Sequence, residues 1–288
     1  MRAYLYLGTH ITSWLGHAGV RGAGQTRTVP MRAYLYLGTH ITSWLGHAGV
    51  PLFVSHRRLK RLRSLPRAIE VWALDSGGFS ELSMFGGWQT TAREYVEAVN
   101  RYDQQIGKLE WAAPQDWMCE PDMVHRTGLS VAEHQRRTVA NYVELRRLWG
   151  EVSDEHCPFM PVLQGYEVSD YAKCMSMYAD AGIDLHNIEL VGVGSVCRRQ
   201  HTDEIRRVFE GILDTDPELP VHGFGVKSLG LREYGHLLTT ADSMAWSLNA
   251  RKHTPLPGCI GKHVHCGNCL DWALRWRRGI VTSREIAA

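Results

Sequence analysis

The chain has 288 residues, of which 44% are hydrophobic, and its formal net charge is only +2 at pH 7. This size and apolar content suit one large catalytic domain, since an eight-fold β/α barrel usually spans roughly 250 residues. No apolar stretch approaches the roughly 20 residues that cross a bilayer, and no small-residue cleavage site follows the start. We therefore expect no membrane partner and no signal peptide.

The N-terminal region contains a duplication, because residues 1–20 recur without change as residues 31–50. Repeats that build an array diverge, since each unit meets different neighbours, so identical copies indicate a recent duplication or an upstream start. We expect residues 1–30 to be a dispensable extension, and residues 31–288 to form the catalytic barrel, with the second copy supplying the first strand. Exchange of the first copy with a second molecule, giving a homodimer, is the alternative.

After the duplication, β-rich runs alternate with helical patterns, which is typical of parallel strands joined by helical crossovers. The pattern predicts eight strands, over residues 33–38, 52–55, 71–75, 109–113, 160–164, 188–193, 221–226 and 243–246. Helices are predicted over residues 57–65, 92–106, 131–148, 169–181, 202–213 and 231–238. Eight strands favour an α/β fold of the closed (β/α)8 TIM-barrel type over a doubly wound sheet.

The chemistry of such barrels gathers at the carboxyl ends of the strands. Four polar or flexible residues lie at these predicted ends or just beyond them: Asp75, Gln164, Gly192 and Gly194. Asp116 lies in the loop after its strand, and Asp242 is expected at the entrance to the last strand. These six positions are the first candidates for a site.

Cysteine and histidine cluster near the C-terminal end, within residues 259–269. An odd total of seven cysteines argues against a secreted disulfide framework and for a reducing cytosol with a metal site. Four ligands suited to a structural Zn²⁺ follow one another as Cys259-x3-His263-x2-Cys266-x2-Cys269. His265 is a competing nitrogen ligand, less convenient because it adjoins a cysteine, and His253 is a third choice. A set of reduced, buried thiols is the other interpretation.

Five motifs, in order along the chain, resemble those of the tRNA-guanine transglycosylase superfamily. They are Asp75-Ser76-Gly77-Gly78-Phe79, Val162-Leu163-Gln164-Gly165, Val191-Gly192-Val193-Gly194, His222-Gly223-Phe224-Gly225-Val226, and the segment from Asp242 to Asn249-Ala250-Arg251. Within the superfamily the chain looks most like the shorter branch that places 7-deazaguanine bases in DNA. The resemblance covers most of residues 70–270.

The resemblance implies a base-exchange reaction, whose chemistry requires two acidic groups. Displacing a base from C1′ passes through a positively charged sugar, so a carboxylate beneath that carbon is the natural nucleophile, and we assign this role to Asp242. A second carboxyl with a raised pKa must protonate the departing base and deprotonate the incoming one, and we assign this role to Asp75. The plainer interpretations are an Asx turn for Asp75 and a helix-to-strand cap for Asp242.

The resemblance also implies a substrate-binding set: Ser76, Gly77, Phe79, Asp116, Gln164, Gly192 and Gly194. In it, Asp116 and Gln164 hydrogen-bond the purine edge, and the two last glycines let backbone donors approach the base. Phe79 is expected to pack near the base. Asp116 could instead belong to an ordinary loop.

Three departures from the tRNA enzymes bear on the substrate. Val264 takes the place of the first metal-binding cysteine, Trp246-Ser247-Leu248 replaces a Pro-Thr-Arg sequence, and Cys197-Arg198-Arg199 stands where an acidic residue is expected. The chain also leaves no residues for an added RNA-binding domain after Arg278. These differences favour DNA over tRNA.

We therefore expect an enzyme that replaces guanine in DNA with a 7-deazaguanine derivative, such as a cyano- or amidino-type base. The target nucleotide would have to turn out of the duplex stack, and Arg275, Arg277 and Arg278 could lie near a backbone phosphate or be solvated. The alternatives are a tRNA-guanine transglycosylase and a non-catalytic base-binding partner subunit. The expected setting is the cytoplasm of a bacterial or phage-infected host, with accessory modification proteins as possible partners.

Overall fold

The computed structural model describes residues 34–197, 199 and 202–285. The chain divides into two units, residues 1–30 and residues 31–288, and all described residues belong to the second. The predictions for residues 1–30, and for the first residue of the first strand, lie outside the described residues. Arg198, within the Cys-Arg-Arg sequence, lies outside them as well.

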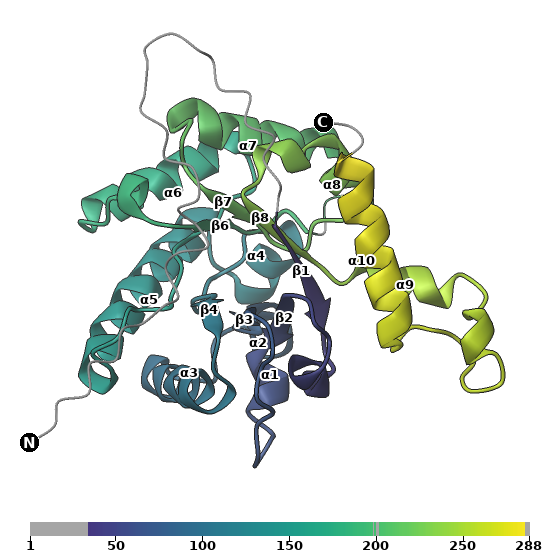
Figure 1. The fold of residues 1–288 in the computed structure, drawn as a ribbon. Helices are drawn as coiled ribbons and strands as arrows, with labels where there is room; N and C mark the ends of the chain where they lie inside the picture. The colour runs from purple at the N-terminus through teal and green to yellow at the C-terminus, as the bar shows by residue number, and fades with distance from the viewer. Residues whose placement is uncertain (1–33, 198, 200–201, 286–288) are drawn as a thin grey trace, which may run out of the picture. The chain divides into compact units, whose positions relative to one another are not determined.

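Eight parallel strands form one curled sheet, in the order β4-β3-β2-β1-β8-β7-β6-β5 (Figure 1). The strands are β1 (Tyr34–Thr39), β2 (Leu52–Ser55), β3 (Trp72–Asp75), β4 (Leu109–Ala112), β5 (Val162–Leu163), β6 (Val191–Val193), β7 (Val221–Gly223) and β8 (Thr240–Ser243). The first and last strands are neighbours, because β1 pairs with both β2 and β8. All eight carboxyl ends therefore meet at one edge.

The two outer strands of the sheet, β4 and β5, meet at a single bridge. Ala112 pairs with Phe159, just before β5 begins, with hydrogen bonds from Ala112 N to Pro158 O of 2.8 Å and from Met160 N to Ala112 O of 3.1 Å. No ladder of paired residues joins β4 to β5 in the described chain. The sheet is thus curled and joined at one point, rather than the continuously paired closed barrel that the sequence predicts.

Aromatic rings fill the inside of the curl. The ring centroid of Trp111, on β4, lies 4.6 Å from that of His222, on β7, and 5.4 Å from that of Tyr36, on β1. Phe53, on β2, lies 6.0 Å from Phe224, just after β7. Because these strands are not neighbours in the sheet, their ring contacts require the sheet to curve until its inward side chains meet.

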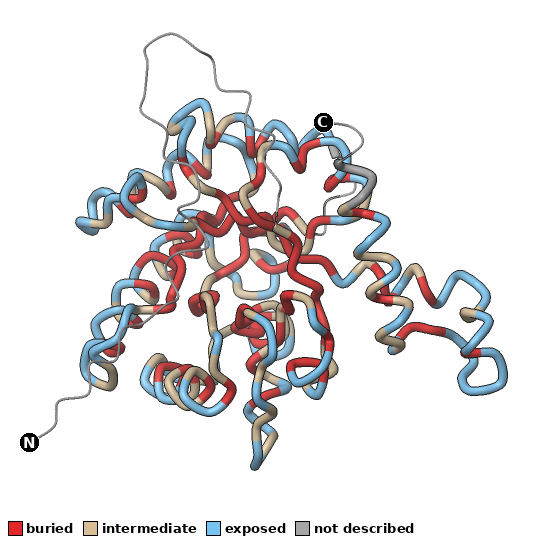
Figure 2. Tube along the Cα trace, in the orientation of Figure 1, coloured by how far each residue is buried: buried red, intermediate tan, exposed pale blue. Residues whose placement is uncertain are grey.

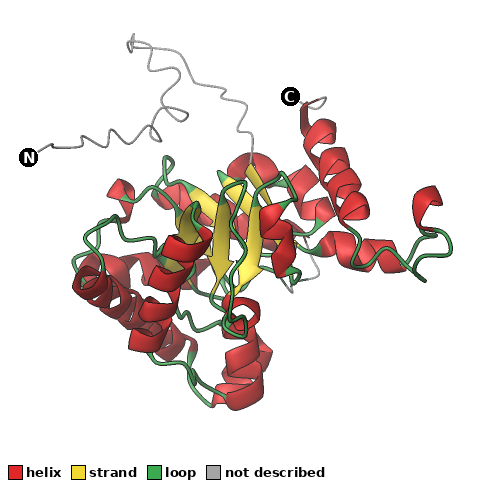
Figure 3. Cartoon of the chain, turned by 60° about the horizontal axis from the view of Figure 1, so that its bottom comes forward, coloured by secondary structure: helices red, strands yellow, loops and turns green. Residues whose placement is uncertain are grey.

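Helices cover the outer face of the sheet, and the buried residues concentrate on the strands and on the helix sides that face them (Figures 2 and 3). The α-helices are α1 (His56–Leu59), α2 (Gly78–Phe85), α3 (Ala92–Ile106), α4 (Pro121–Thr127), α5 (Val131–Val152), α6 (Val168–Asp180), α7 (Thr202–Thr215), α8 (Ser228–Glu233), α9 (Ala245–Arg251) and α10 (Leu270–Glu285). Short 3₁₀ helices are η1 (Thr42–Gly46), η2 (Leu185–Asn187), η3 (Gly235–Leu237) and η4 (Pro257–Cys259). None of the described helices is both long and apolar enough to cross a bilayer.

Helix α3 illustrates how local sequence sets these boundaries. It begins after Thr91, whose side chain accepts from Glu94 N while the Glu94 side chain accepts from Thr91 N, forming a capping box. It ends at Gly107, which has a positive φ of 70°. Its Tyr95 side chain is fully buried and donates to Ala113 O at 2.8 Å, which ties the helix to the end of β4.

The last strand differs from the sequence prediction, which placed it over residues 243–246. Strand β8 ends at Ser243, and Trp246 belongs to α9, where it is fully buried and donates from Nε1 to Gly38 O at 2.8 Å. The apolar run was misassigned because a buried helix face and a strand look alike over a few residues. Asp242 consequently lies within β8, near its carboxyl end, and not at the entrance to the strand.

Candidate active site

Five predicted site residues meet at the carboxyl edge of the sheet. Asp75 is the last residue of β3, Asp242 lies one residue before the end of β8, and Gln164 directly follows β5. Gly194 follows β6, and Asp116 lies in the loop after β4. The sheet thus brings together side chains that are widely separated in the sequence.

Asp242 is buried and held by one of its two oxygens. Its exposed fraction is 6%, and Oδ1 accepts from the backbone N–H of Gly225 at 2.8 Å and lies 3.4 Å from Nε2 of His222. Among the described residues, both contacts fall on Oδ1, which leaves Oδ2 as the oxygen available to a substrate. The interpretation of Asp242 as a helix-to-strand cap is wrong, since it is a strand residue.

His222 orients this carboxylate from inside the curled sheet. The ring is fully buried, and its Nδ1 lies 2.7 Å from Oγ1 of Thr240. Burial lowers the His222 pKa, against the opposing effect of the Asp242 hydrogen bond. A neutral ring can donate a hydrogen bond from Nε2 to Asp242 while Nδ1 accepts a hydrogen bond from the Thr240 hydroxyl. Sequence reasoning placed His222 within a strand motif but gave it no role.

Asp75 forms the Asx turn that was its alternative interpretation, and it also has a raised pKa. Its Oδ1 accepts from Gly77 N at 2.9 Å, which closes the turn. Burial raises its pKa most strongly, hydrogen bonds from Gly77 and Ser55 oppose this, and the charge of Asp242 raises it further. Such a carboxyl keeps its proton to higher pH than an exposed aspartate does.

Arg57 lies against the turn and was not predicted as a site residue. A Cβ added at Gly77, which has a φ of 83°, would lie 2.8 Å from Cγ of Arg57. Nη1 of Arg57 lies 3.5 Å from Oε1 of the buried Glu81, and the guanidinium lowers the pKa of Asp75. Gly77 is therefore required both for its left-handed backbone and for this close approach.

Asp116 and Gln164 form a directly bonded pair. The amide nitrogen of Gln164 donates to Oδ2 of Asp116, and Gln164 is fully buried. Burial raises the pKa of Asp116 to about 7, despite the Gln164 hydrogen bond, and the charge of Asp75 adds to this rise. A Cβ added at Gly78 would lie 3.3 Å from Oδ1 of Asp116, so the pair adjoins the Asp75 motif. The pair can offer both a donor and an acceptor to the edge of a purine.

Ser195 fixes the other end of this amide and was missed from the sequence. Its hydroxyl donates to Oε1 of Gln164 at 2.6 Å, lies 2.9 Å from Oε2 of Glu120, and accepts from Cys119 N at 2.7 Å. Ser195 also has a positive φ of 57°, which is rare for a residue other than glycine. Strained backbone of this kind often marks a functional site, and no sequence pattern announced it here.

The two glycines of the β6 segment do not offer free backbone donors. Gly192 N donates to Pro161 O at 2.8 Å, and Gly194 N donates to Leu163 O at 3.0 Å, so both N–H groups are used within the sheet. This corrects the expectation that they would reach a bound base. A Cβ at Gly194 would lie 2.2 Å from the Gln164 amide nitrogen, so this glycine makes room for the side chain that faces the site.

The remaining predicted substrate residues have mixed placements. Ser76 is 2% exposed at the turn beside Asp75. Phe79 lies in α2 and packs in a small cluster with Leu82 and Trp117. Its contact with a base stays a prediction.

The predicted metal ligands converge in the segment that joins α9 to α10, two helices that Figure 1 shows side by side. One ligand atom from each of Cys259, His263, Cys266 and Cys269 lies within 4.8 Å of all the others. Sγ of Cys259 and Sγ of Cys269 are 3.8 Å apart, and Nε2 of His263 is 3.2 Å from Sγ of Cys266. Tetrahedral Zn²⁺ with bonds of about 2.3 Å places two sulfurs about 3.8 Å apart. This Cys₃His cluster can therefore hold a metal ion such as zinc.

The competing nitrogen ligands are otherwise engaged. Nδ1 of His265 accepts from Gly267 N at 3.2 Å, and Nδ1 of His253 lies 2.8 Å from Asn249 O. Neither histidine belongs to the converging cluster in the described chain. Of the candidates, the geometry selects His263.

Arg277, on α10, lies away from the catalytic edge. Nε of Arg277 donates to Leu35 O at 3.0 Å, near the amino end of β1 and so at the opposite end of the strands. Arg275 and Arg278 are exposed. Arg277 thus contributes to the fold, and a phosphate contact of these arginines stays a prediction.

Comparison with known proteins agrees with the resemblance. A protein-family model described as DeoxyPurine in DNA protein A (DpdA) matches residues 31–287. A search of curated proteins found no significant match. The family match begins at the second copy of the duplicated segment and includes every candidate site residue. The chain therefore belongs to the DeoxyPurine in DNA protein A family, the DNA 7-deazaguanine transglycosylases.

Proposed function

We propose that this protein replaces guanine in DNA with a 7-deazaguanine derivative, through a covalent intermediate between Asp242 and the sugar. The observation that carries the proposal is the meeting of two carboxyl groups at one edge of the sheet. Asp242 has one oxygen tied to Gly225 N, while burial and the charge of Asp242 raise the pKa of Asp75. This division gives one nucleophile and one acid.

In the first step, Oδ2 of Asp242 attacks C1′ as the bond from C1′ to the guanine nitrogen breaks. The carboxylic acid of Asp75 gives its proton to the departing guanine and becomes a carboxylate. In the second step that carboxylate takes a proton from the incoming base, whose ring nitrogen attacks C1′ and breaks the ester bond to Asp242. Protons and bonds balance over the cycle, and no further reactant is needed.

Recognition of the base falls to Asp116 and Gln164. Their bonded pair offers a donor and an acceptor beside Asp75, and Ser195 holds the amide in one orientation. Gly194 contributes space rather than a hydrogen bond. Ser76 and Gly77 keep the turn that carries the acid, and Phe79 would border the base on the α2 side.

We assign the fold to the (β/α)8 class and the metal to a structural Zn²⁺. The strand order and the bridge between Ala112 and Phe159 support the first assignment. Four protein ligands leave no open position on the ion, which supports the second. The cluster packs on Ala250 of α9 and Trp272 of α10, so the metal would fix the segment that follows the nucleophile.

No disulfide joins the seven cysteines, all of which lie in the described chain, and this supports a cytoplasmic location in a bacterial or phage-infected host. The incoming 7-deazaguanine base would be supplied by other proteins.

The test is base exchange by the purified full chain, with duplex DNA and tRNA supplied in parallel and labelled guanine as the incoming base. We expect label to enter DNA, and a DNA adduct that survives denaturation to form with the wild type but not with Asp242→Asn. Asp203→Asn, an exposed carboxylate on α7, is the matched control. Label in tRNA alone would assign the tRNA reaction instead, and neither label nor adduct would indicate a non-catalytic binding subunit.

A further inference from the structure

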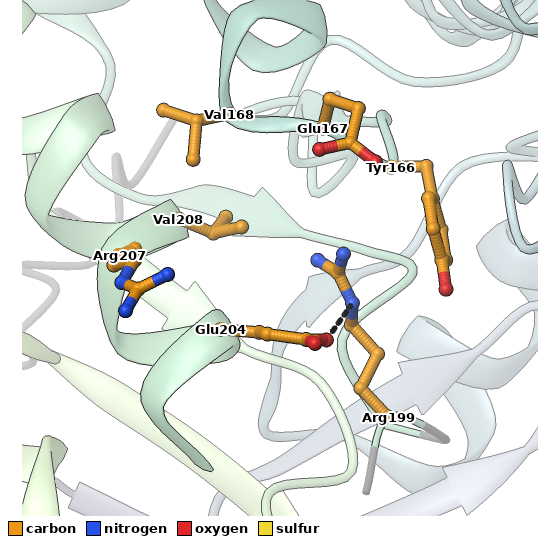
Figure 4. Close-up of a pocket in the computed structure, with 7 residues that line it drawn as sticks. All are labelled: Tyr166, Glu167, Val168, Arg199, Glu204, Arg207 and Val208. Atoms are coloured by element: carbon orange, nitrogen blue, oxygen red, sulfur yellow. Dashed lines mark ion pairs between the residues drawn. The ribbon is translucent and has the colours of Figure 1, made fainter. Parts of the chain in front are cut away.

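A pocket lies between α6 and α7 (Figure 4). Its volume is about 260 Å³, and it is lined by Tyr166, Arg199, Glu204 and Arg207, among others. Tyr166 lies two residues after Gln164, so their Cα atoms are at most about 7.6 Å apart. Arg199 lies four residues after Ser195 in the same loop. The pocket therefore borders the residues that would hold the base.

Arg199 is buried in this pocket, where its guanidinium makes one long ion pair, with Glu204. Its side chain is 7% exposed, and both Nε and Nη1 are buried without a hydrogen-bond partner among the described residues. Glu204 Oε2 lies 3.8 Å from Nε, too far for a hydrogen bond. A buried charge without hydrogen bonds costs stability. A ligand that accepted hydrogen bonds from Nε and Nη1 of Arg199 would remove this cost, so these two groups are donors ready for a ligand.

The geometry also indicates which kind of ligand fits. The guanidinium carbon of Arg199 lies 4.3 Å from the centroid of the Tyr166 ring, which covers one face of the group. Figure 4 shows the guanidinium between Tyr166 and helix α7, with Arg207 on that helix. Because Tyr166 covers one face of the guanidinium, the N–H groups along the edge of Arg199 are what a ligand can contact. Such an edge binds oxygen anions, above all phosphate. Glu204 is 47% exposed and can turn to solvent when an anion enters.

We propose that this pocket binds a phosphate group of the DNA strand that carries the target base, with Arg199 as its main contact and Arg207 as a second positive charge. The proposal rests on the proposed function for its choice of DNA as the source. It gives a role to Arg199, the last residue of the Cys-Arg-Arg sequence that stands where an acidic residue is expected. The phosphate would anchor the strand while the base occupies the neighbouring site.

The test measures DNA binding by the full chain over a range of salt concentrations. Each phosphate contact contributes about 0.9 to the slope of log affinity against log salt on a duplex, and about 0.7 on a single strand. We expect Arg199→Gln to lower the slope by about that amount and to weaken binding. Arg206→Gln is the matched control, because Arg206 lies on α7 but pairs with Asp203 and Glu210 outside the pocket. An unchanged slope in Arg199→Gln would overturn the DNA contact.

Thermal unfolding separates a binding role from a structural one. Nε and Nη1 of Arg199 make no hydrogen bond among the described residues, and its ion-pair partner Glu204 is largely solvated, so removal of this buried charge should leave the melting temperature of Arg199→Gln unchanged or raise it. A marked fall would show that Arg199 holds the fold, and would overturn the proposal unless Arg207→Gln, at an exposed position, still reduces the slope.

A second arm titrates the same variants with inorganic phosphate by calorimetry. Binding of phosphate that is lost in Arg199→Gln, together with an unchanged DNA slope, would keep the anion site but assign it to a free phosphate compound. If Arg199→Gln changes neither the binding of inorganic phosphate nor the salt slope of DNA binding, the anion site is overturned altogether. Because base exchange is measured separately, exchange that proceeds with an unchanged slope overturns this inference and leaves the proposed function standing.

Discussion

Gln164 donates a hydrogen bond from its amide nitrogen to the carboxylate of Asp116, across the ends of β5 and β4. Because Ser195 donates to the oxygen of the same amide, Gln164 cannot turn without breaking both contacts. Under the proposed function, Ser195 would therefore set the order of donor and acceptor that an incoming base meets, without touching the base itself.

We predict that Ser195→Ala lowers the efficiency with which the enzyme uses the incoming base. The change leaves the Gln164 oxygen and Cys119 N without their partner, at a cost of about 1–3 kcal/mol, so kcat/KM for the base should fall roughly 10- to 100-fold, mainly through KM. Steady-state exchange kinetics measure this. Ser176→Ala, at an exposed serine on α6, is the control, and equal KM values for the two variants would contradict the positioning role.

Asp242→Asn should abolish exchange while preserving the fold. Asparagine can still accept from Gly225 N, so we expect an unchanged melting temperature, but a carboxamide is a poor nucleophile and the rate should fall by at least about a thousandfold. Single-turnover assays check the rate, and denaturing gels check the adduct. A persisting adduct would mean that another residue is the nucleophile.

The acidity of Asp116 predicts a pH-dependent gain in stability when it is replaced. Its pKa rises on folding from 3.8 to about 7. Below about pH 4 both states are protonated, so the wild type and Asp116→Asn should differ little. Between about pH 4 and 7 only the unfolded wild type ionises, so its stability falls as the pH rises, and above pH 7 the loss is complete.

At pH 8, Asp116→Asn should therefore be more stable than the wild type by up to about 4 kcal/mol. Urea unfolding at pH 4 and pH 8 measures the difference. Asp122→Asn, an exposed position on α4, should show no such change between the two pH values. If the difference in free energy of unfolding between Asp116→Asn and the wild type is the same at pH 8 as at pH 4, the pKa of Asp116 is not raised by folding.

Metal analysis should find one zinc per chain, lost in His263→Ala and kept in His265→Ala. The reason is geometric, since only His263 lies within the converging ligand set. Without metal, nothing would join the four ligands to one another and the segment beside α9 and α10 should loosen, so we expect a lower melting temperature. Mass spectrometry of intact protein and thermal unfolding check both effects, and retention of zinc by His263→Ala would refute the ligand set.

A chain that starts at Met31 should fold and exchange bases as the full chain does. Residues 31–50 repeat residues 1–20, and the family match begins at residue 31. Size-exclusion chromatography and thermal unfolding of the truncated protein test this directly. A truncated chain that loses a dimer present in the full chain would instead support strand exchange.

Local signals made some elements predictable and others not. The boundaries of α3 follow from Thr91 and Gly107, and the prediction of 92–106 is confirmed. The short α2 escaped notice because its first turn is the Gly-Gly of the Asp75 motif. Strand β8 was misplaced because Trp246 is as apolar as a strand residue would be.

The same distinction applies to the site. Asp75, Asp116 and Gln164 were found because each stands close to a strand end, and parallel strands bring such ends together. The roles of Ser195 and His222 depend on contacts between segments far apart in the chain, which periodicity cannot reveal. The N–H groups of the β6 glycines were misjudged for the same reason, since their sheet partners are known only once the register is fixed.

The aromatic packing inside the curled sheet has a consequence for the order of events. The rings of Trp111 and Phe224 pack edge-on against His222, which contacts the Asp242 carboxylate, so aromatic side chains fill the interior of the sheet next to this carboxylate. Under the proposed function, a base that leaves and a base that arrives would therefore use the same side of the sheet, one after the other. We then expect double-displacement kinetics, in which the sugar stays bound to the protein between the two steps and free guanine competes with the modified base.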